Sequence, residues 1–280
     1  MALLEVVAVT VRFGGITAVD DASIDAEGGT VTGLIGPNGA GKTTLFNVIS
    51  GLQPPTHGRV RFKNSDITRS SVSHRAKRGM GRTFQRLEAF GSLSVRENIQ
   101  VARDIHGGVR QWLRFTKDPK VDDLIDLVGL ARYADQRADS VPTGVARLVE
   151  VARALAIEPE LLLLDEPSSG LDEAETKALG ELLRRLANDG RAILMVEHDM
   201  DLVMGVCDLI HVLEFGKVIA TGTAAEIRSD RTVQAAYLGF SDAEAVRMPD
   251  EVAAQATQLV GARVALGETR PMPAVRTEHR

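Results

Sequence analysis

The sequence predicts an α/β fold with a mostly parallel core sheet. Strand-type segments alternate with segments of helical periodicity along most of the chain, which is the order typical of such folds. A glycine-rich segment at residues 36–41 separates a strand-type segment from a helical one. The leucine run at residues 161–164 is apolar on both faces, as a strand buried within a parallel sheet must be.

The expected strands are β-branched or leucine-rich and lie at residues 3–11, 30–35, 59–63, 161–164, 192–196, 209–214 and 218–221. The expected helices lie at residues 42–50, 145–156 and 173–188. Between residues 94 and 130 the apolar side chains also recur at helical spacing, which interrupts the alternation. We therefore expect one domain at residues 1–240 that contains a helical subdomain at about 87–155.

Residues 241–280 are expected to form a C-terminal appendage. After Gly239 the composition shifts to Ala, Asp, Glu, Pro and Arg. One helix is expected there, with Pro249 near its start. The last segment, residues 267–280, is expected to be disordered, so the appendage is partly helical or disordered.

Composition excludes several classes of protein. The chain has 280 residues and a single cysteine, Cys207, which argues against a disulfide scaffold and a cysteine zinc site. The longest stretch without a charged residue, 43–58, contains Pro, Asn, Gln and His, so no membrane-spanning helix is expected. The amino terminus does not resemble a signal peptide, and the net charge of −5 disfavours nucleic acid as a partner. A cytosolic protein is expected.

Residues 36–43, GPNGAGKT, match the phosphate-binding pattern G-x-x-x-x-G-K-[ST] between a strand and a helix. The glycines allow backbone N–H groups to surround phosphate oxygens, and the helix start adds its positive dipole end. Lys42 is expected to reach the β- and γ-phosphates of ATP, and the Thr43 hydroxyl is expected to bind Mg²⁺. The predicted nucleotide-binding residues are Gly36, Pro37, Asn38, Gly39, Ala40, Gly41, Lys42, Thr43 and Thr44.

Two adjacent carboxylates, Asp165 and Glu166, follow the leucine run. Ligand sites of open α/β sheets collect at the ends of such strands. Asp165 is expected to hold Mg²⁺ through its water shell, and Glu166 to orient or deprotonate the attacking water. A simple acidic turn is the alternative, but the phosphate-binding loop favours ATP hydrolysis.

Together these motifs resemble the ATP-binding subunits of ABC transporters over about residues 3–240, a P-loop NTPase family. The resemblance implies an antiparallel N-terminal β subdomain. It also implies that Phe13 stacks on adenine, that Gln85 contacts Mg²⁺ and the attacking water, and that His198 contacts the γ-phosphate. The alternative for Phe13 is a core residue at a strand end. Residues 169–172, which end in Asp172, resemble the loop that crosses to the partner's ATP site in the dimer.

The chain departs from the family at the signature segment, normally Leu-Ser-Gly-Gly-Gln. The aligned residues are Val-Pro-Thr-Gly-Val at 141–145, so Gly144 is kept and Pro142 replaces the serine. Proline has neither a hydroxyl nor an N–H, so some of the hydrogen bonds to the partner's γ-phosphate are expected to be missing. Thr143 could supply a shifted hydroxyl. With an intact partner subunit, ATP on this chain's own loop is expected to hydrolyse fast and the other ATP slowly.

The segments at 82–85 and 196–239 resemble the larger ATP-binding subunit of branched-chain amino acid importers. The implied partners are two membrane-spanning permease subunits, a different ATP-binding subunit and, indirectly, a solute-binding protein. The chain would then lie on the cytoplasmic face of the inner membrane. Related subunits serve urea, amides and lipopolysaccharide export, so the cargo is inferred by likeness alone.

Two other functions stay open: a soluble ABC-type ATPase acting on nucleic acid or ribosomes, and a regulatory subunit with negligible turnover. Proteins of the first kind usually have tandem ATPase domains or long coiled-coil arms, whereas this chain has one phosphate-binding loop and no heptad run. The second is supported only by the altered signature segment. The helical insert also carries Arg103, Arg110, Arg114, Lys117 and Lys120 around Trp112. These residues are expected either to face the anionic inner leaflet or the membrane subunit, or to form an ordinary solvated helix pair.

Overall fold

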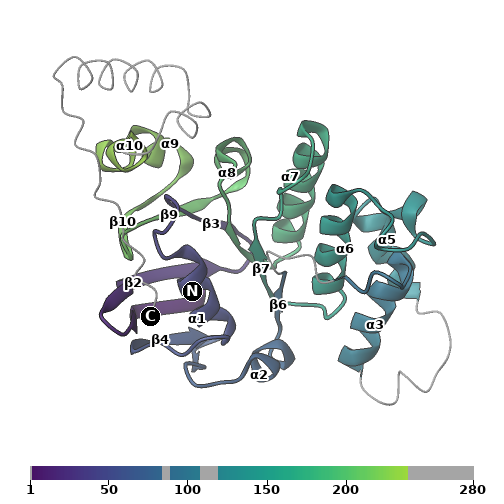
Figure 1. The fold of residues 1–280 in the computed structure, drawn as a ribbon, viewed down its shortest axis with the longest axis horizontal. Coiled ribbons are helices and arrows are strands. Elements are labelled where there is room, and N and C mark those ends of the chain that lie inside the picture. The colour runs from purple at the N-terminus through teal and green to yellow at the C-terminus, as the bar shows by residue number, and fades with distance from the viewer. Residues whose placement is uncertain (1, 84–88, 108–118, 239–280) are drawn as a thin grey trace, which may run out of the picture.

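The computed structural model describes residues 2–83, 89–107 and 119–238 (Figure 1). Its strands are β1 Ala2–Phe13, β2 Ile16–Glu27, β3 Val31–Ile35, β4 His57–Phe62, β5 Ser65–Asp66, β6 Met80–Arg82, β7 Leu161–Asp165, β8 Ala192–Val196, β9 Leu209–Glu214 and β10 Lys217–Gly222. Its helices are α1 Lys42–Ser50, α2 Val72–Lys77, α3 Val95–Gly107, α5 Pro119–Leu127, α6 Thr143–Leu155, α7 Glu173–Asn188, α8 Met200–Val206, α9 Ala224–Ser229 and α10 Arg231–Leu238, with a 3₁₀ turn at Ala131–Tyr133.

The core sheet has the strand order β10-β9-β3-β8-β7-β6. Every pair in it is parallel except β9 with β10. All residues of β3, β7 and β8 are buried, which explains their continuous apolar sequences. A second, antiparallel sheet has the order β2-β1-β4-β5. The predicted fold class is therefore confirmed.

Helix α1 packs between the two sheets (Figure 1). Its apolar side, with Leu45, Phe46 and Ile49 fully buried, belongs to the hydrophobic cluster shared with β1, β2 and β4. A second cluster joins the other face of the core sheet to α6 and α7 and to the helices of the insert. The helix that follows the glycine-rich segment is thus held from both sides.

Several described elements were not expected from the sequence. Strand β2 is one of them, because its apolar residues alternate with Asp and Ser, so only one face is buried. Strands β5 and β6 and helices α2, α8 and α9 are at most seven residues long, too short for a hydrophobic period to show. Strand β6 exists because it pairs with β7, a contact that its own residues do not predict.

The insert contains α3 and α5, as its helical pattern predicts. Arg103 and Lys120 both bind the Glu158 carboxylate, at 2.9 and 2.5 Å, and Arg103 also donates to the carbonyl oxygen of Ala156. Their pairing favours the solvated-helix interpretation over a membrane-facing one. The remaining basic residues around Trp112, and the expected appendage at 241–280, lie outside the described residues. Within the described ranges, every helix is too short or too polar to cross a bilayer.

Candidate functional site

The phosphate-binding loop connects β3 to α1 and needs glycine at two positions for steric reasons. A Cβ atom at Gly36 would lie 1.9 Å from the carbonyl oxygen of Leu213. A Cβ atom at Gly41 would lie 2.4 Å from the carbonyl oxygen of Ala18, and Gly41 has a left-handed φ of 102°. Because both neighbours are backbone atoms, a larger residue would displace the loop itself.

Helix α1 begins directly after Gly41, and no described side chain caps its start. The N-terminus of a helix, with its positive dipole end, is a favourable place for an anion such as phosphate. The Lys42 ammonium donates to the carbonyl oxygens of Gly36 and Pro37, the latter at 2.9 Å. Thr43 is exposed beside it. The structure thus brings the residues of the predicted phosphate site together.

Asp165 ends β7 with a side chain that is only 3% exposed. Its N–H donates to the Thr83 hydroxyl at 3.2 Å, and its carboxylate is paired with Arg82. Burial raises the pKa of Asp165, and the Arg82 charge opposes that rise. Glu166 follows with a φ of 49°, uncommon for a residue with a side chain, and donates its N–H to the carbonyl oxygen of Val196.

His198 follows β8, and its side chain is 57% exposed. The residue before it, Glu197, is buried and had no predicted role. Its carboxylate accepts the N–H groups of Ser168, His198 and Asp199 at 2.8, 3.0 and 3.4 Å. Glu197 therefore fixes the segment that carries His198 to the segment that follows Glu166. The sequence contained one signal, an acidic residue directly after a buried strand.

Phe13 lies at the tip of the β1–β2 hairpin, where it pairs with Ile16. Its side chain is 52% exposed, so the alternative of a core phenylalanine is wrong. Ala18, two residues beyond Ile16 on β2, is the residue whose carbonyl oxygen lies against Gly41. The hairpin tip is thus adjacent to the phosphate-binding loop, where an exposed aromatic ring could stack on a base.

The signature segment starts α6, on the other side of β7 from α1 (Figure 1). Pro142 and Thr143 are exposed, and no described side chain caps the helix. Gly144 is buried, and a Cβ atom there would lie 2.8 Å from both Glu175 Oε2 and Leu171 Cδ2. Asp172 caps α7 in a reciprocal box with Glu175. The two segments predicted to reach the partner's ATP therefore form one continuous surface.

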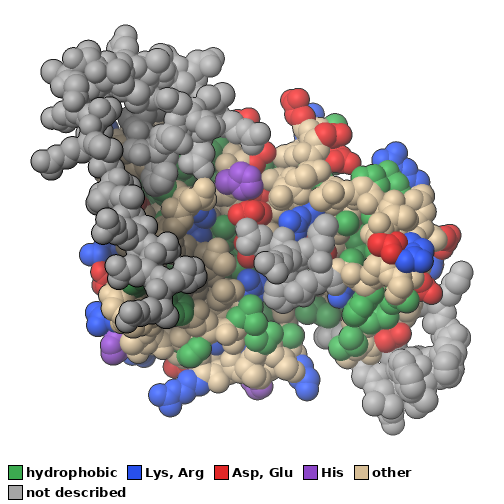
Figure 2. All heavy atoms as spheres, in the orientation of Figure 1, with side chains coloured by type: hydrophobic (Ala, Val, Ile, Leu, Met, Phe, Trp, Pro, Cys, Tyr) green, Lys and Arg blue, Asp and Glu red, His purple; other side chains and the backbone are tan. Residues whose placement is uncertain are grey.

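Gln85 lies outside the described residues, so its place relative to Asp165 stays a prediction. Figure 2 shows one face of the molecule, on which basic, acidic and apolar side chains lie side by side. In the described part of the chain, no three His, Cys, Asp or Glu side chains are grouped as a metal cluster. The predicted metal site instead uses oxygen groups, which Mg²⁺ prefers. Among the described residues these would be the hydroxyl of Thr43 and the carboxylate of Asp165, the latter through the water shell of the ion.

Comparison with known proteins agrees with this geometry. The ABC transporter family model matches residues 19–169, and a model for branched-chain amino acid ATP-binding cassette transporters matches residues 217–239. The branched-chain amino acid transport ATP-binding protein LivG of Salmonella typhimurium is 37% identical over 85% of this chain and 98% of its own. BraF of Pseudomonas aeruginosa is 35% identical with the same coverage. LptB of Haemophilus influenzae, a lipopolysaccharide export ATP-binding protein, is 34% identical over 79% and 90%.

Solved structures show the same fold. A nucleotide-free ATP-binding cassette from an ABC transporter matches with a TM-score of 0.76 and 29% identity, over 85% of this chain and 99% of that one. The ADP conformation of the cassette MJ1267 matches with a TM-score of 0.76 and 30% identity, over 86% and 100%. The chain belongs to the ABC transporter ATP-binding family, the class that its phosphate-binding loop and acidic pair define. Within that family it is an ATPase similar to LivG and BraF.

Proposed function

We propose that this chain is the ATP-hydrolysing, energy-coupling subunit of an ABC importer for branched-chain amino acids or a related small polar solute. The main support for this cargo is the match of residues 217–239 to the family model for branched-chain amino acid ATP-binding cassette transporters. LivG relatives are also matched over more of their length than LptB, 98% against 90%. Lipopolysaccharide export is the second candidate because LptB is almost as similar in sequence.

The described side chains fit the steps of ATP hydrolysis. The N–H groups of the loop and the Lys42 ammonium bind the phosphates, and Phe13 stacks on adenine. Thr43 and Asp165, the latter through the water shell of the ion, would hold Mg²⁺ together with Gln85, which lies outside the described residues. The ion would offset the negative charge of the phosphate oxygens. Glu166 orients or deprotonates the attacking water, and His198 contacts the γ-phosphate.

ATP binding closes a dimer of two ATP-binding subunits, and hydrolysis reopens it. In such a dimer each ATP lies between one subunit's phosphate-binding loop and the other's signature segment. We propose a different subunit as partner, because Pro142 impairs only the site that this chain completes with Thr143, Gly144 and Asp172. A homodimer would carry that impairment twice.

The remaining partners are two membrane-spanning permease subunits and, indirectly, a solute-binding protein, which places the chain on the cytoplasmic face of the inner membrane. A groove of about 250 Å³ is a candidate docking place for a permease. It lies between α2 and β6 on one side and α3 and α6 on the other, with the exposed apolar side chains of Leu52 and Val72 on its wall. Thr83, next to Asp165, also lines it, so docking there would contact the metal site indirectly.

The test is the change Glu166→Gln in the complex reconstituted in lipid. We expect ATPase activity to fall at least about 100-fold, since a general base contributes about 10²–10⁴-fold. ATPase activity that survives largely intact would contradict the assignment of the fast site to this chain. The wild-type complex decides the cargo: leucine, isoleucine or valine with the solute-binding protein should stimulate it, whereas stimulation by lipopolysaccharide alone would support the second candidate.

A further inference from the structure

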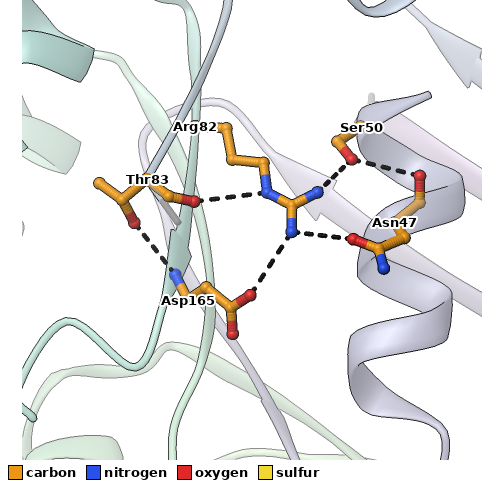
Figure 3. A network of polar contacts seen from close by, with 5 residues as sticks. All are labelled: Asn47, Ser50, Arg82, Thr83 and Asp165. Carbon is orange, nitrogen blue, oxygen red and sulfur yellow. Dashed lines mark hydrogen bonds and ion pairs between the residues drawn. The ribbon is translucent and has the colours of Figure 1, made fainter. Parts of the chain in front are cut away.

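Arg82 connects three parts of the molecule through one nearly buried guanidinium, whose side chain is 11% exposed (Figure 3). It lies at the end of β6, beside β7 in the parallel sheet. Its Nη2 group donates to Asn47 Oδ1 at 2.9 Å and approaches Asp165 Oδ2 at 3.5 Å. Its Nη1 group donates to the Ser50 hydroxyl, and Nε donates to the carbonyl oxygen of Thr83 at 3.3 Å.

These contacts join the two elements that carry Thr43 and Asp165, two of the three residues predicted to hold the metal. Asn47 and Ser50 belong to α1, the helix that begins with Lys42 and Thr43. Asp165 ends the neighbouring strand β7. The guanidinium also lies over the Phe46 ring, 4.9 Å from its centre, which fixes its plane. A rigid cation therefore holds one oxygen of the Asp165 carboxylate toward α1 and leaves the other oxygen free of Arg82.

A second buried arginine shows what a purely structural role looks like. The Arg75 guanidinium donates only to backbone carbonyl oxygens in the described contacts, those of Val48 and Ile49 at the end of α1 and those of residues 67, 68 and 70. It contacts α1 as Arg82 does, but none of its described contacts is with Asp165. The two arginines therefore differ in that Arg82 is paired with the Asp165 carboxylate, whereas Arg75 contacts backbone oxygens in the described contacts.

We propose that Arg82 is a positioning residue for the Mg²⁺ site. It fixes the Asp165 carboxylate relative to helix α1, so that Thr43 and Asp165 reach one ion together. This inference rests on the proposed role of Asp165 in holding the metal. Outer-sphere partners of metal ligands typically change metal affinity by about 10–100-fold when removed. Arg82 is expected to act in that range, on metal affinity rather than on phosphate binding.

The experiment uses the purified full-length chain and the variants Arg82→Met and Arg82→Lys. Binding of Mn²⁺ is followed by electron paramagnetic resonance with a non-hydrolysable ATP analogue, and ATP affinity is measured without divalent metal. For Arg82→Met we expect Mn²⁺ affinity about 10–100-fold lower, with metal-free ATP affinity changed less than about threefold. Arg82→Lys should fall between, because its point charge cannot form the fork to both α1 and Asp165.

Ser50→Ala is the matched control, since it removes one acceptor on α1 and leaves the pair between Arg82 and Asp165. Its Mn²⁺ affinity should stay within about threefold of wild type. Unchanged Mn²⁺ affinity in both Arg82 variants, or tighter binding that would indicate competition between cation and metal, overturns the inference. Asp165→Asn separates the two claims: if it too leaves Mn²⁺ binding unchanged, the proposed metal site fails, and otherwise only the role of Arg82 fails.

Discussion

Two helix starts, those of α1 and α6, differ in how strictly the surrounding structure requires their sequences. Both begin without a described side-chain cap, and both depend on a glycine in close contact. At α1 the neighbours of Gly36 and Gly41 are backbone oxygens of β9 and β2. At α6 the nearest neighbours of Gly144 are the ends of two side chains, from Glu175 and Leu171.

The difference indicates how each helix start responds to sequence change. The start of α1 is held by two sheets, so its loop geometry cannot adapt. The start of α6 faces outward at Pro142 and Thr143 and packs on flexible side chains, so its sequence can vary while the fold is kept. In the proposed dimer, the functional consequence of variation at α6 would fall on the partner's ATP, whereas variation at the start of α1 would affect the ATP bound by this chain.

The largest expected effect is on ATP affinity, and it comes from replacing Gly41 by alanine, with Gly144 replaced in a separate variant for comparison. Gly41→Ala puts a Cβ atom 2.4 Å from the Ala18 carbonyl oxygen at a φ of 102°, so the loop must move. Losing one or two N–H contacts to phosphate, at about 1.5–3 kcal/mol each, weakens ATP binding about 100-fold. Gly144→Ala should leave the affinity of the isolated chain for ATP unchanged and cost about 1–3 kcal/mol of unfolding free energy.

Calorimetric titration with ATP and urea unfolding measure both quantities on the same samples. The proposed difference between the starts of α1 and α6 would be contradicted if Gly144→Ala weakened ATP binding by the isolated chain as much as Gly41→Ala does. Such a result would mean that the start of α6 contributes to the chain's own ATP site.

The next effect concerns Phe13, the residue that is proposed to stack on adenine. Phe13→Ala removes base stacking, worth about 1–3 kcal/mol, so the affinity for ATP should fall about 5–100-fold. Ile16→Ala is the matched control, because Ile16 is an exposed apolar residue of the same hairpin and pairs with Phe13. Equal losses in the two variants would indicate that the hairpin, rather than the ring, supports binding.

A smaller effect is expected at the capping box that supports Gly144. Asp172→Ala removes the cap of α7 and should lower the unfolding free energy by about 1 kcal/mol. Thr223→Ala removes the same type of box from α9, which lies elsewhere on the chain, and should cost about as much. If Asp172 also reaches the partner's ATP, only Asp172→Ala lowers the ATPase activity of the assembled complex. Equal activities would restrict Asp172 to its structural role.

The parts of the structure that the sequence could predict are those with local signals, and the parts that it could not predict depend on contacts between distant residues. Helix α1 and strands β7 and β8 were predictable because their signals are local: a glycine pattern followed by a helix, and apolar runs bounded by polar residues. Strand β6 and the role of Arg82 were not, because both arise from contacts with β7 and α1 that are far away in the chain. Glu197 was missed for the same reason, since its partner Ser168 is 29 positions away.

The smallest expected effect, and the most informative, is that of Pro142→Ser in the reconstituted complex. Pro142 has φ −55° and ψ 153°, which serine adopts readily as a helix cap, so the change should stabilise the chain by about 0.5–2 kcal/mol. In the proposed dimer it would also add a hydroxyl and an N–H on the side of the partner's ATP. In a Glu166→Gln background, which silences this chain's own site, the residual ATPase activity should rise about two- to fivefold, as one added hydrogen bond of about 0.5–1 kcal/mol would give.

The paired change Thr143→Ala in the same background identifies which hydroxyl acts at this site. If Pro142→Ser raises the residual activity and Thr143→Ala leaves it unchanged, the departure at position 142 is what makes the two ATP sites unequal. If Pro142→Ser has no effect and Thr143→Ala lowers the activity, Thr143 already supplies the contact. The start of α6 would then be complete despite its altered sequence, and the contrast with α1 would be one of rigidity alone.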